Sequence, residues 1–183
     1  MEPTKLKTGS SFIGKKMQSI EVQTTHGVKK IPEDYRWKWV VLLCHPGDFN
    51  LTCLEEFYAF AKRDEEFKKL NTELIGISID ENTCNIKCIR WLKQKLKLNI
   101  PFPIITDCLG DIETIQGLIH PSNKVRVVII IDMEGFIRLM IYYPKIIDMR
   151  VDEILGAIKS LQISDGNKNT TDSLLTKKIN KRS

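Results

Sequence analysis

A thiol at the start of a predicted helix is the strongest chemical feature of this chain. Cys53 follows the apolar run 39–44 and the turn residues 45–48, and it opens a series of apolar residues at helical spacing. The first turn of a helix offers unpaired backbone N–H groups and a partial positive charge, which both favour thiolate over thiol. Because thiolate is the nucleophilic form of cysteine, Cys53 is a candidate nucleophile.

The residues just before Cys53 could position its sulfur. Thr52 and Glu55 form a capping-box pattern, while Asn50 could instead cap the helix by accepting the N–H of Cys53. Pro46 has a fixed φ and could shape a turn that screens the sulfur from water. The alternative is that Cys53 is an inert small residue of the core. The combination of strand, turn and capped helix start favours a reactive thiol.

Length and composition predict one globular domain. The chain has 183 residues, of which 42% are hydrophobic. No apolar run approaches the ~18 residues that a membrane span needs, and residues 1–16 lack the apolar core of a secretory signal. We therefore expect a cytoplasmic protein without a membrane segment. In a reducing compartment its five cysteines are expected to be free or catalytic thiols.

Charge is concentrated at the C-terminal end. Five Lys or Arg and two Asp or Glu in residues 164–183 give this segment a net charge of +3, which leaves +2 of the total +5 for the rest of the chain. This near balance gives no reason to expect a nucleic-acid partner. The segment is rich in Asn, Ser, Thr and Lys and has no sustained apolar face. It predicts a disordered basic tail after a domain at 1–163.

The apolar pattern predicts alternating strands and helices. A hairpin is expected at 19–31, with strands at 39–44, 73–79, 102–106, 125–132 and 137–143, and helices at 53–69, 82–98, 110–118 and 152–161. Residues 127–131 are continuously apolar, which is typical of a strand in a sheet covered on both faces. The expected fold is α/β, with a central mixed sheet and helices on both faces.

Around Cys53 the chain resembles the peroxiredoxins (the AhpC/TSA family). The family pattern is Pro, three residues, Thr or Ser, two residues and Cys, and Pro46 and Cys53 have this spacing. His45, Asp48, Phe49, Glu56 and Phe57 also resemble the family context. Further similarity lies at 73–80, 100–103, 125–128, 141–144 and 152–155. The resemblance covers about residues 10–162 and is greatest to the group of one-cysteine enzymes with archaeal and bacterial relatives.

The resemblance implies a thioredoxin-like fold and a thiol-specific peroxidase. Cys53 would attack hydrogen peroxide or a small organic hydroperoxide and become a sulfenic acid. Arg126 would hold the thiolate and, with Asn50, bind the peroxide, while Pro46 would shape the catalytic turn. His45, Glu56 and Arg150 are expected to contact the catalytic residues rather than the peroxide. No metal, haem or flavin is required.

The chain departs from the family pattern at two places that bear on activity. Asn50 stands where the family has Thr or Ser, whose hydroxyl contacts peroxide and thiolate. Residues 147–150 replace a Thr-Gly-Arg-Asn-like turn, with Arg150 retained. The alternative function is therefore a catalytically weakened redox sensor or a holdase-type interaction protein.

The thiol that would recycle Cys53 is left open by the sequence. No cysteine follows Ser164, so an external reductant such as thioredoxin or a low-molecular-weight thiol is the simplest expectation. Cys84 and Cys88, four residues apart on a predicted helix, or Cys108 could resolve the sulfenic acid internally, or each could be structural. Cys44 is expected to be buried. Family resemblance suggests a homodimer that can assemble into rings.

Overall fold

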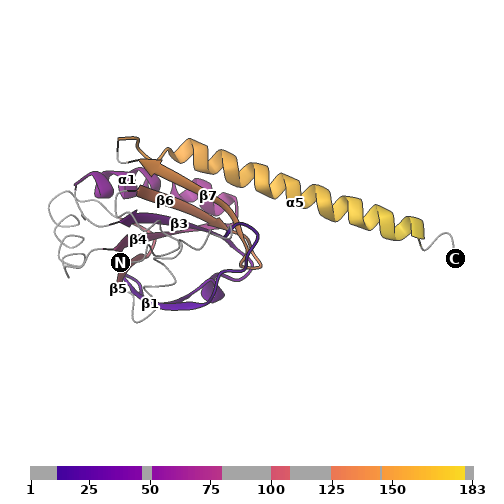
Figure 1. The fold of residues 1–183 in the computed structure, drawn as a ribbon, viewed down its shortest axis with the longest axis horizontal. Helices are drawn as coiled ribbons and strands as arrows, with labels where there is room; N and C mark the ends of the chain where they lie inside the picture. Colours follow the sequence, from indigo (N-terminus) through magenta and orange to yellow (C-terminus); the bar gives the residue numbers. More distant parts are fainter. Residues whose placement is uncertain (1–11, 47–50, 80–99, 108–124, 145, 180–183) are drawn as a thin grey trace, which may run out of the picture.

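The computed structural model describes residues 12–46, 51–79, 100–107, 125–144 and 146–179. Side chains are described in these ranges except at 46, 51–54, 78–79, 106–107 and 167–179. The strands are β1 (Ile20–Thr24), β2 (Gly27–Ile31), β3 (Trp39–Pro46), β4 (Thr72–Ile79), β5 (Ile104–Asp107), β6 (Val125–Ile131) and β7 (Ile137–Pro144). The helices are η1 (Glu33–Tyr35), α1 (Leu51–Ala61), α2 (Asp64–Lys69) and α5 (Val151–Ile179) (Figure 1).

The described strands form one mixed sheet in the order β2-β1-β5-β4-β3-β6-β7. β3, β4 and β5 run parallel to one another, whereas β6 is antiparallel to β3 and β7 is antiparallel to β6. Cys44 near the end of β3 lies opposite Val127 near the start of β6. The antiparallel register therefore brings the first residues of β6, including Arg126, beside the carboxyl end of β3.

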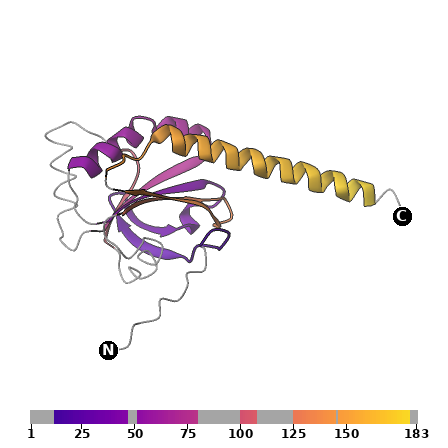
Figure 2. The ribbon, with the colours of Figure 1, turned by 45° about the horizontal axis from the view of Figure 1, so that its top comes forward.

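Two apolar layers cover the sheet, one on each face. Helices α1, α2 and α5 pack on one face, where Phe57, Phe67 and Ile158 are fully buried. Figure 2 shows these helices together on one side of the strands. The opposite face is packed by other residues of the strands, including Ile20 and Ile31 of the β1–β2 hairpin. The helices predicted at 82–98 and 110–118 lie outside the described residues.

The single helix predicted at 53–69 is wrong, because the structure has two. α1 ends at Ala61, and α2 begins at Asp64. At the break, the N–H of Arg63 donates to the carbonyl of Phe60 at 3.0 Å, which is a tighter turn than the α-helix makes. The bend brings the rings of Phe60 and Phe67 to 5.9 Å. Both rings are fully buried, so packing against the sheet overrides the continuous helical spacing.

The other predicted strands are confirmed with small shifts in their ends. β5 begins at Ile104, two residues after the predicted start. Pro103 has no N–H to give a strand ladder, which accounts for this late start. Its carbonyl still accepts the N–H of Gly76 on β4 at 2.9 Å. The hairpin is also confirmed, with Thr24 and Gly27 paired at its turn.

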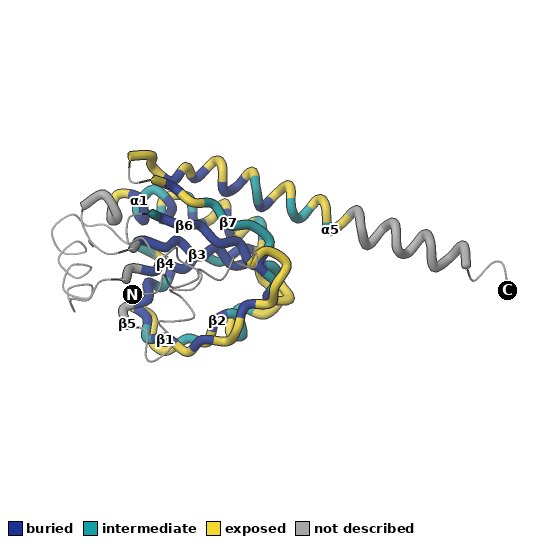
Figure 3. Tube along the Cα trace, viewed as in Figure 1, coloured by how far each residue is buried: buried dark blue, intermediate teal, exposed yellow. Residues whose placement is uncertain are grey.

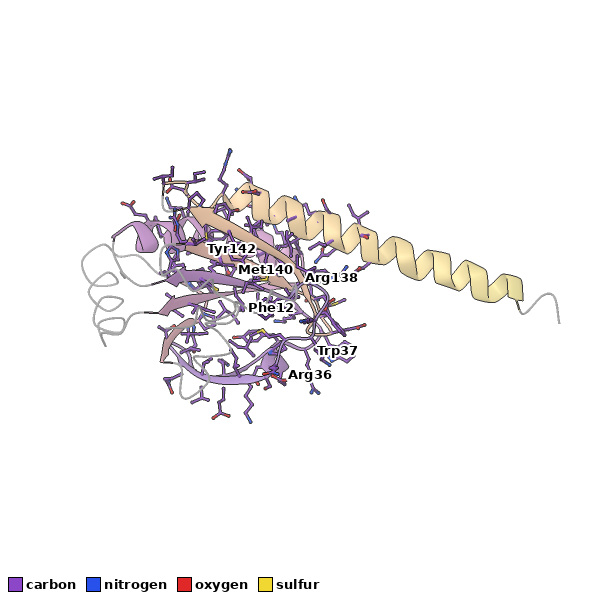
Figure 4. The ribbon with its side chains drawn as sticks, viewed as in Figure 1. Phe12, Arg36, Trp37, Arg138, Met140 and Tyr142 are labelled. Atoms are coloured by element: carbon purple, nitrogen blue, oxygen red, sulfur yellow. The ribbon has the colours of Figure 1, made fainter. Side chains whose placement is uncertain are left out.

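The last helix is much longer than predicted. α5 continues past residue 161 to Ile179, so the backbone of 164–179 is helical although its composition predicted no regular structure. Arg138 of β7 holds this continuation at Asp165 through two hydrogen bonds of 2.7 and 2.8 Å. Figure 4 labels Arg138 where β7 runs alongside α5. The division into a domain at 1–163 and a tail at 164–183 stays a prediction.

Figure 1 shows the C-terminal part of α5 projecting beyond the sheet. In the described part of the chain, no helix has both the length and the apolar character that crossing a membrane requires.

Candidate active site

Cys53 lies in the first turn of a helix, as the sequence predicted. β3 ends at Pro46, and α1 begins at Leu51. Thr52 is therefore inside the helix rather than at its cap. Asn50 lies outside the described residues, as do Cys84, Cys88 and Cys108, and the side chains of Pro46 and Cys53 are not described. The surroundings of α1 consequently define the described part of the site.

Three charged or polar side chains form a buried cluster beside α1. His45 of β3, Glu56 of α1 and Arg126 of β6 are each 5% exposed. His45 Nε2 lies 2.9 Å from Glu56 Oε2, and Arg126 Nη1 donates to Glu56 Oε1. Glu56 is one helical turn after Cys53, so the cluster adjoins the part of α1 that carries the thiol.

The backbone after β7 completes this cluster. The N–H of Met149 donates to Glu56 Oε1 at 3.0 Å. Arg126 Nη2 donates to the carbonyl of Pro144 at 3.1 Å and also to the carbonyl of Ile147. These partners were not predicted, because backbone groups carry no signature of residue type. Together the contacts hold Pro144, Ile147 and Met149 against the buried ion pair.

Arg150 does not join the cluster through its side chain. It is exposed just before α5, and among the described residues its side chain has no ion pair with Glu56. Its carbonyl accepts the N–H of Ile154 at 3.3 Å in the first turn of α5. Of the three supporting residues expected from the sequence, the structure thus brings together His45 and Glu56 but not Arg150.

The pKa of Glu56 is lowered despite its burial. Burial by itself raises the pKa of a carboxyl group, but hydrogen bonds from His45, the Met149 N–H and Arg126 outweigh that effect. Glu56 is therefore a carboxylate at neutral pH. It compensates the charge of Arg126, which a buried guanidinium needs.

Phe57 and Gly76 fix α1 closely on the sheet. The ring of Phe57 packs edge-on against His45, with their centroids 5.0 Å apart. A Cβ on Gly76 of β4 would lie 3.1 Å from the Phe57 ring and 3.1 Å from the side chain of Ile104. A larger residue here would require Phe57 or Ile104 to shift by a few tenths of an ångström, so glycine favours the close approach that brings Glu56 to His45 and Arg126.

Cys44 is fully buried on β3, which confirms its predicted place in the core. The described residues contain no group of three or more His, Cys, Asp or Glu side chains that could hold a metal ion. What the cluster offers chemically is a fixed, charge-compensated guanidinium near the helix turn that carries a thiol.

A model of the AhpC/TSA family matches residues 13–140. The chain belongs to the AhpC/TSA family, the peroxiredoxins. The chain is 53% identical over 157 residues to a peroxiredoxin of Thermotoga petrophila, covering 84% of this chain and 73% of the relative. Peroxiredoxin 2 of Sulfurisphaera tokodaii is 50% identical over 157 residues, covering 84% and 74%. Peroxiredoxins are thiol-dependent peroxidases, and the chain is accordingly an enzyme of that class.

Solved peroxiredoxin structures share the fold. A yeast mitochondrial 1-Cys peroxiredoxin superimposes with a TM-score of 0.73 at 32% identity, covering 84% of this chain and 78% of that one. The 2-Cys peroxiredoxin of Plasmodium vivax gives a TM-score of 0.72, covering 86% of this chain and 85% of that one, and at 23% identity it supports the fold alone. The α/β fold of this peroxiredoxin is thus thioredoxin-like, as its sequence predicted.

Proposed function

We propose that this peroxiredoxin reduces hydrogen peroxide and small organic hydroperoxides through Cys53. The Cys53 thiolate attacks the terminal oxygen of the peroxide, a sulfur–oxygen bond forms and the O–O bond breaks. Cys53 becomes a sulfenic acid, and the departing oxygen takes a proton from solvent to leave as water or an alcohol. The oxidised sulfur has gained the oxygen that the peroxide has lost.

The observation that carries this proposal is the position of Arg126. Its contact with Glu56 sets a permanent positive charge beside α1, one turn from Cys53. A guanidinium keeps its charge at any physiological pH and presents several donors. Charge placed in advance where negative charge gathers in the transition state is among the largest catalytic effects. We assign Arg126 to holding the thiolate and polarising the peroxide, with Asn50 as a further hydrogen-bonding group and Pro46 shaping the turn.

His45 and Glu56 then act as positioning residues for Arg126. Glu56 accepts a hydrogen bond from Nη1 of Arg126, while the carbonyls of Pro144 and Ile147 accept from Nη2. These contacts restrict the rotation of a long side chain, so that little entropy is lost when a peroxide binds.

The second half of the cycle needs a thiol. It attacks the Cys53 sulfenic acid, releases water and forms a disulfide, which another thiol then reduces. We assign this role to an external reductant, either a thioredoxin-like protein or a low-molecular-weight thiol. Internal resolution by Cys84, Cys88 or Cys108 is the competing route. A homodimer, able to assemble into rings in the cytoplasm, is the expected form of the enzyme.

A peroxide-consumption assay with excess dithiothreitol tests the proposal. The wild type should consume peroxide and the Cys53→Ser variant should not. Equal rates for the two proteins would end the assignment. Intact mass after one equivalent of peroxide, with and without a sulfenic-acid trap, separates the two resolving routes. A trapped adduct indicates an external thiol, whereas a loss of two hydrogens indicates an internal disulfide.

The identity of residue 50 supports a second candidate function. Asn at this position has a larger and differently directed hydrogen-bonding group than Thr or Ser. A protein with slow turnover whose Cys53 still reacts stoichiometrically would be a redox sensor or a holdase. Asn50→Thr discriminates between these functions: a large gain in turnover supports the sensor, and an unchanged rate supports the peroxidase.

A further inference from the structure

Two consecutive isoleucines are exposed in the turn after β7. Ile146 is 91% exposed and Ile147 is 49% exposed. Figure 3 shows this turn as an exposed segment close to α1. Single exposed apolar residues are ordinary, but adjacent ones on one turn next to an active site are a candidate contact surface.

The position of the turn is fixed by backbone atoms rather than by these side chains. The N–H of Ile147 donates to the carbonyl of Pro144 at 3.0 Å. The carbonyl oxygens of Pro144 and Ile147 also accept hydrogen bonds from Arg126. Backbone contacts therefore hold the turn in place, and the side chain of Ile146, which is 91% exposed, adds almost no packing to the fold.

The same contacts place the turn directly beside Arg126. Ile147 touches the guanidinium that we assign to the peroxide, through its own carbonyl oxygen. A molecule bound by Arg126 would have this turn as an immediate neighbour. Ile147 lies in the segment that replaces the Thr-Gly-Arg-Asn-like turn of the family pattern.

We infer that Ile146 and Ile147 are specificity-determining residues that favour hydroperoxides with apolar tails over hydrogen peroxide. The inference rests on the proposed function and names the substrate preference of that same site. An apolar tail gains free energy by leaving water against the isoleucines, whereas hydrogen peroxide has no tail to bury. The chemical step is unchanged, since the tail leaves with the alcohol product.

Kinetics of a double variant, Ile146→Thr with Ile147→Thr, test this inference. Threonine keeps the β-branched shape and replaces a carbon branch with a hydroxyl group. The ratio of kcat/KM for cumene hydroperoxide to that for hydrogen peroxide should fall about fivefold, because one methylene in a closed pocket changes specificity by ~10-fold or more and an open rim changes it less. The kcat/KM for hydrogen peroxide should fall by a smaller factor than that for cumene hydroperoxide.

Val28→Thr is the matched control. Val28 is exposed on β2, at the edge of the sheet opposite to β7, and the substitution has the same chemistry. It should leave the ratio unchanged. An equal fall of both rates in the double variant, or an unchanged ratio, would overturn the inference.

Two further outcomes have distinct meanings. If the wild type consumes neither peroxide faster than Cys53→Ser, the proposed function fails and the specificity inference falls with it. If the double variant sediments as a smaller species while its ratio is unchanged, the isoleucines serve contact between copies of the chain. That result also overturns a role in substrate preference.

Discussion

Replacing Glu56 with Gln removes the negative charge of the buried cluster and keeps the shape of the side chain. Arg126 would then be a buried cation without its carboxylate. Removing one partner of a buried ion pair costs ~3–5 kcal/mol. In this variant Arg126 still donates hydrogen bonds to the carbonyls of Pro144 and Ile147, and the glutamine side chain still offers one acceptor oxygen. We therefore expect the lower end, a loss of about 3 kcal/mol in the free energy of unfolding at pH 7.

The loss should depend on pH with a definite sign. The pKa of Glu56 is lowered in the folded state from an ordinary value of 4.5. Its contribution to stability is therefore fully present above about pH 4.5 and is lost as the pH falls through the lowered folded value. The difference between wild type and Glu56→Gln should therefore be constant from pH 7 down to about pH 4.5 and should narrow only at lower pH.

Urea unfolding at pH 7 and pH 3 measures both effects. Glu66→Gln is the control, because Glu66 makes the same kind of pair with Arg63 at an exposed site, where little change is expected. A loss below about 1 kcal/mol at pH 7, or an equal loss at both pH values, would refute the buried ion pair as a source of stability.

Three further predictions concern the backbone and the site. Trp37, labelled in Figure 4, is 77% exposed and has a left-handed φ of 70°. Glycine adopts this φ without strain, so Trp37→Gly should stabilise the fold by about 0.5 kcal/mol in thermal unfolding. Trp37→Ala should give no such gain, because alanine also has a Cβ. Gly76→Ala should destabilise by ~1–3 kcal/mol and slow peroxide consumption, and Phe57→Leu in the same chain should restore part of both. Arg126→Lys should fold yet raise the pKa of Cys53 measured by alkylation, since a lysine cannot reproduce the fork of donors; an unchanged pKa would remove Arg126 from thiol activation.

The strands could be predicted because their residues are locally distinctive. The apolar run 127–131 and the β-branched run 73–79 appear as β6 and β4 with ends shifted by at most a residue or two. The break between α1 and α2 could not be predicted from spacing, because it depends on Phe60 and Phe67 meeting over the sheet. The continuation of α5 past residue 161 is held at Asp165 by Arg138, which is far away in the sequence.

Some parts of the candidate site could be predicted from the sequence and others could not. Residue types and spacing in the family pattern identified His45, Glu56 and Arg126, and the structure brings these three together. Backbone atoms of Pro144, Ile147 and Met149 make the remaining contacts. The residue types at these positions therefore give no indication of their role. A sequence pattern could therefore identify the ion pair but not the segment that holds it.

The proposed peroxidase chemistry requires Cys53 to be a thiolate at neutral pH, and alkylation tests this most directly. The rate of reaction with iodoacetamide, followed at Cys53 by peptide mass spectrometry from pH 4 to pH 9, gives the pKa of that thiol. We predict a midpoint well below the ordinary value of about 8.5 and a reaction faster at Cys53 than at any other cysteine. A midpoint at or above about 8.5, or faster labelling elsewhere in the folded protein, would contradict the account.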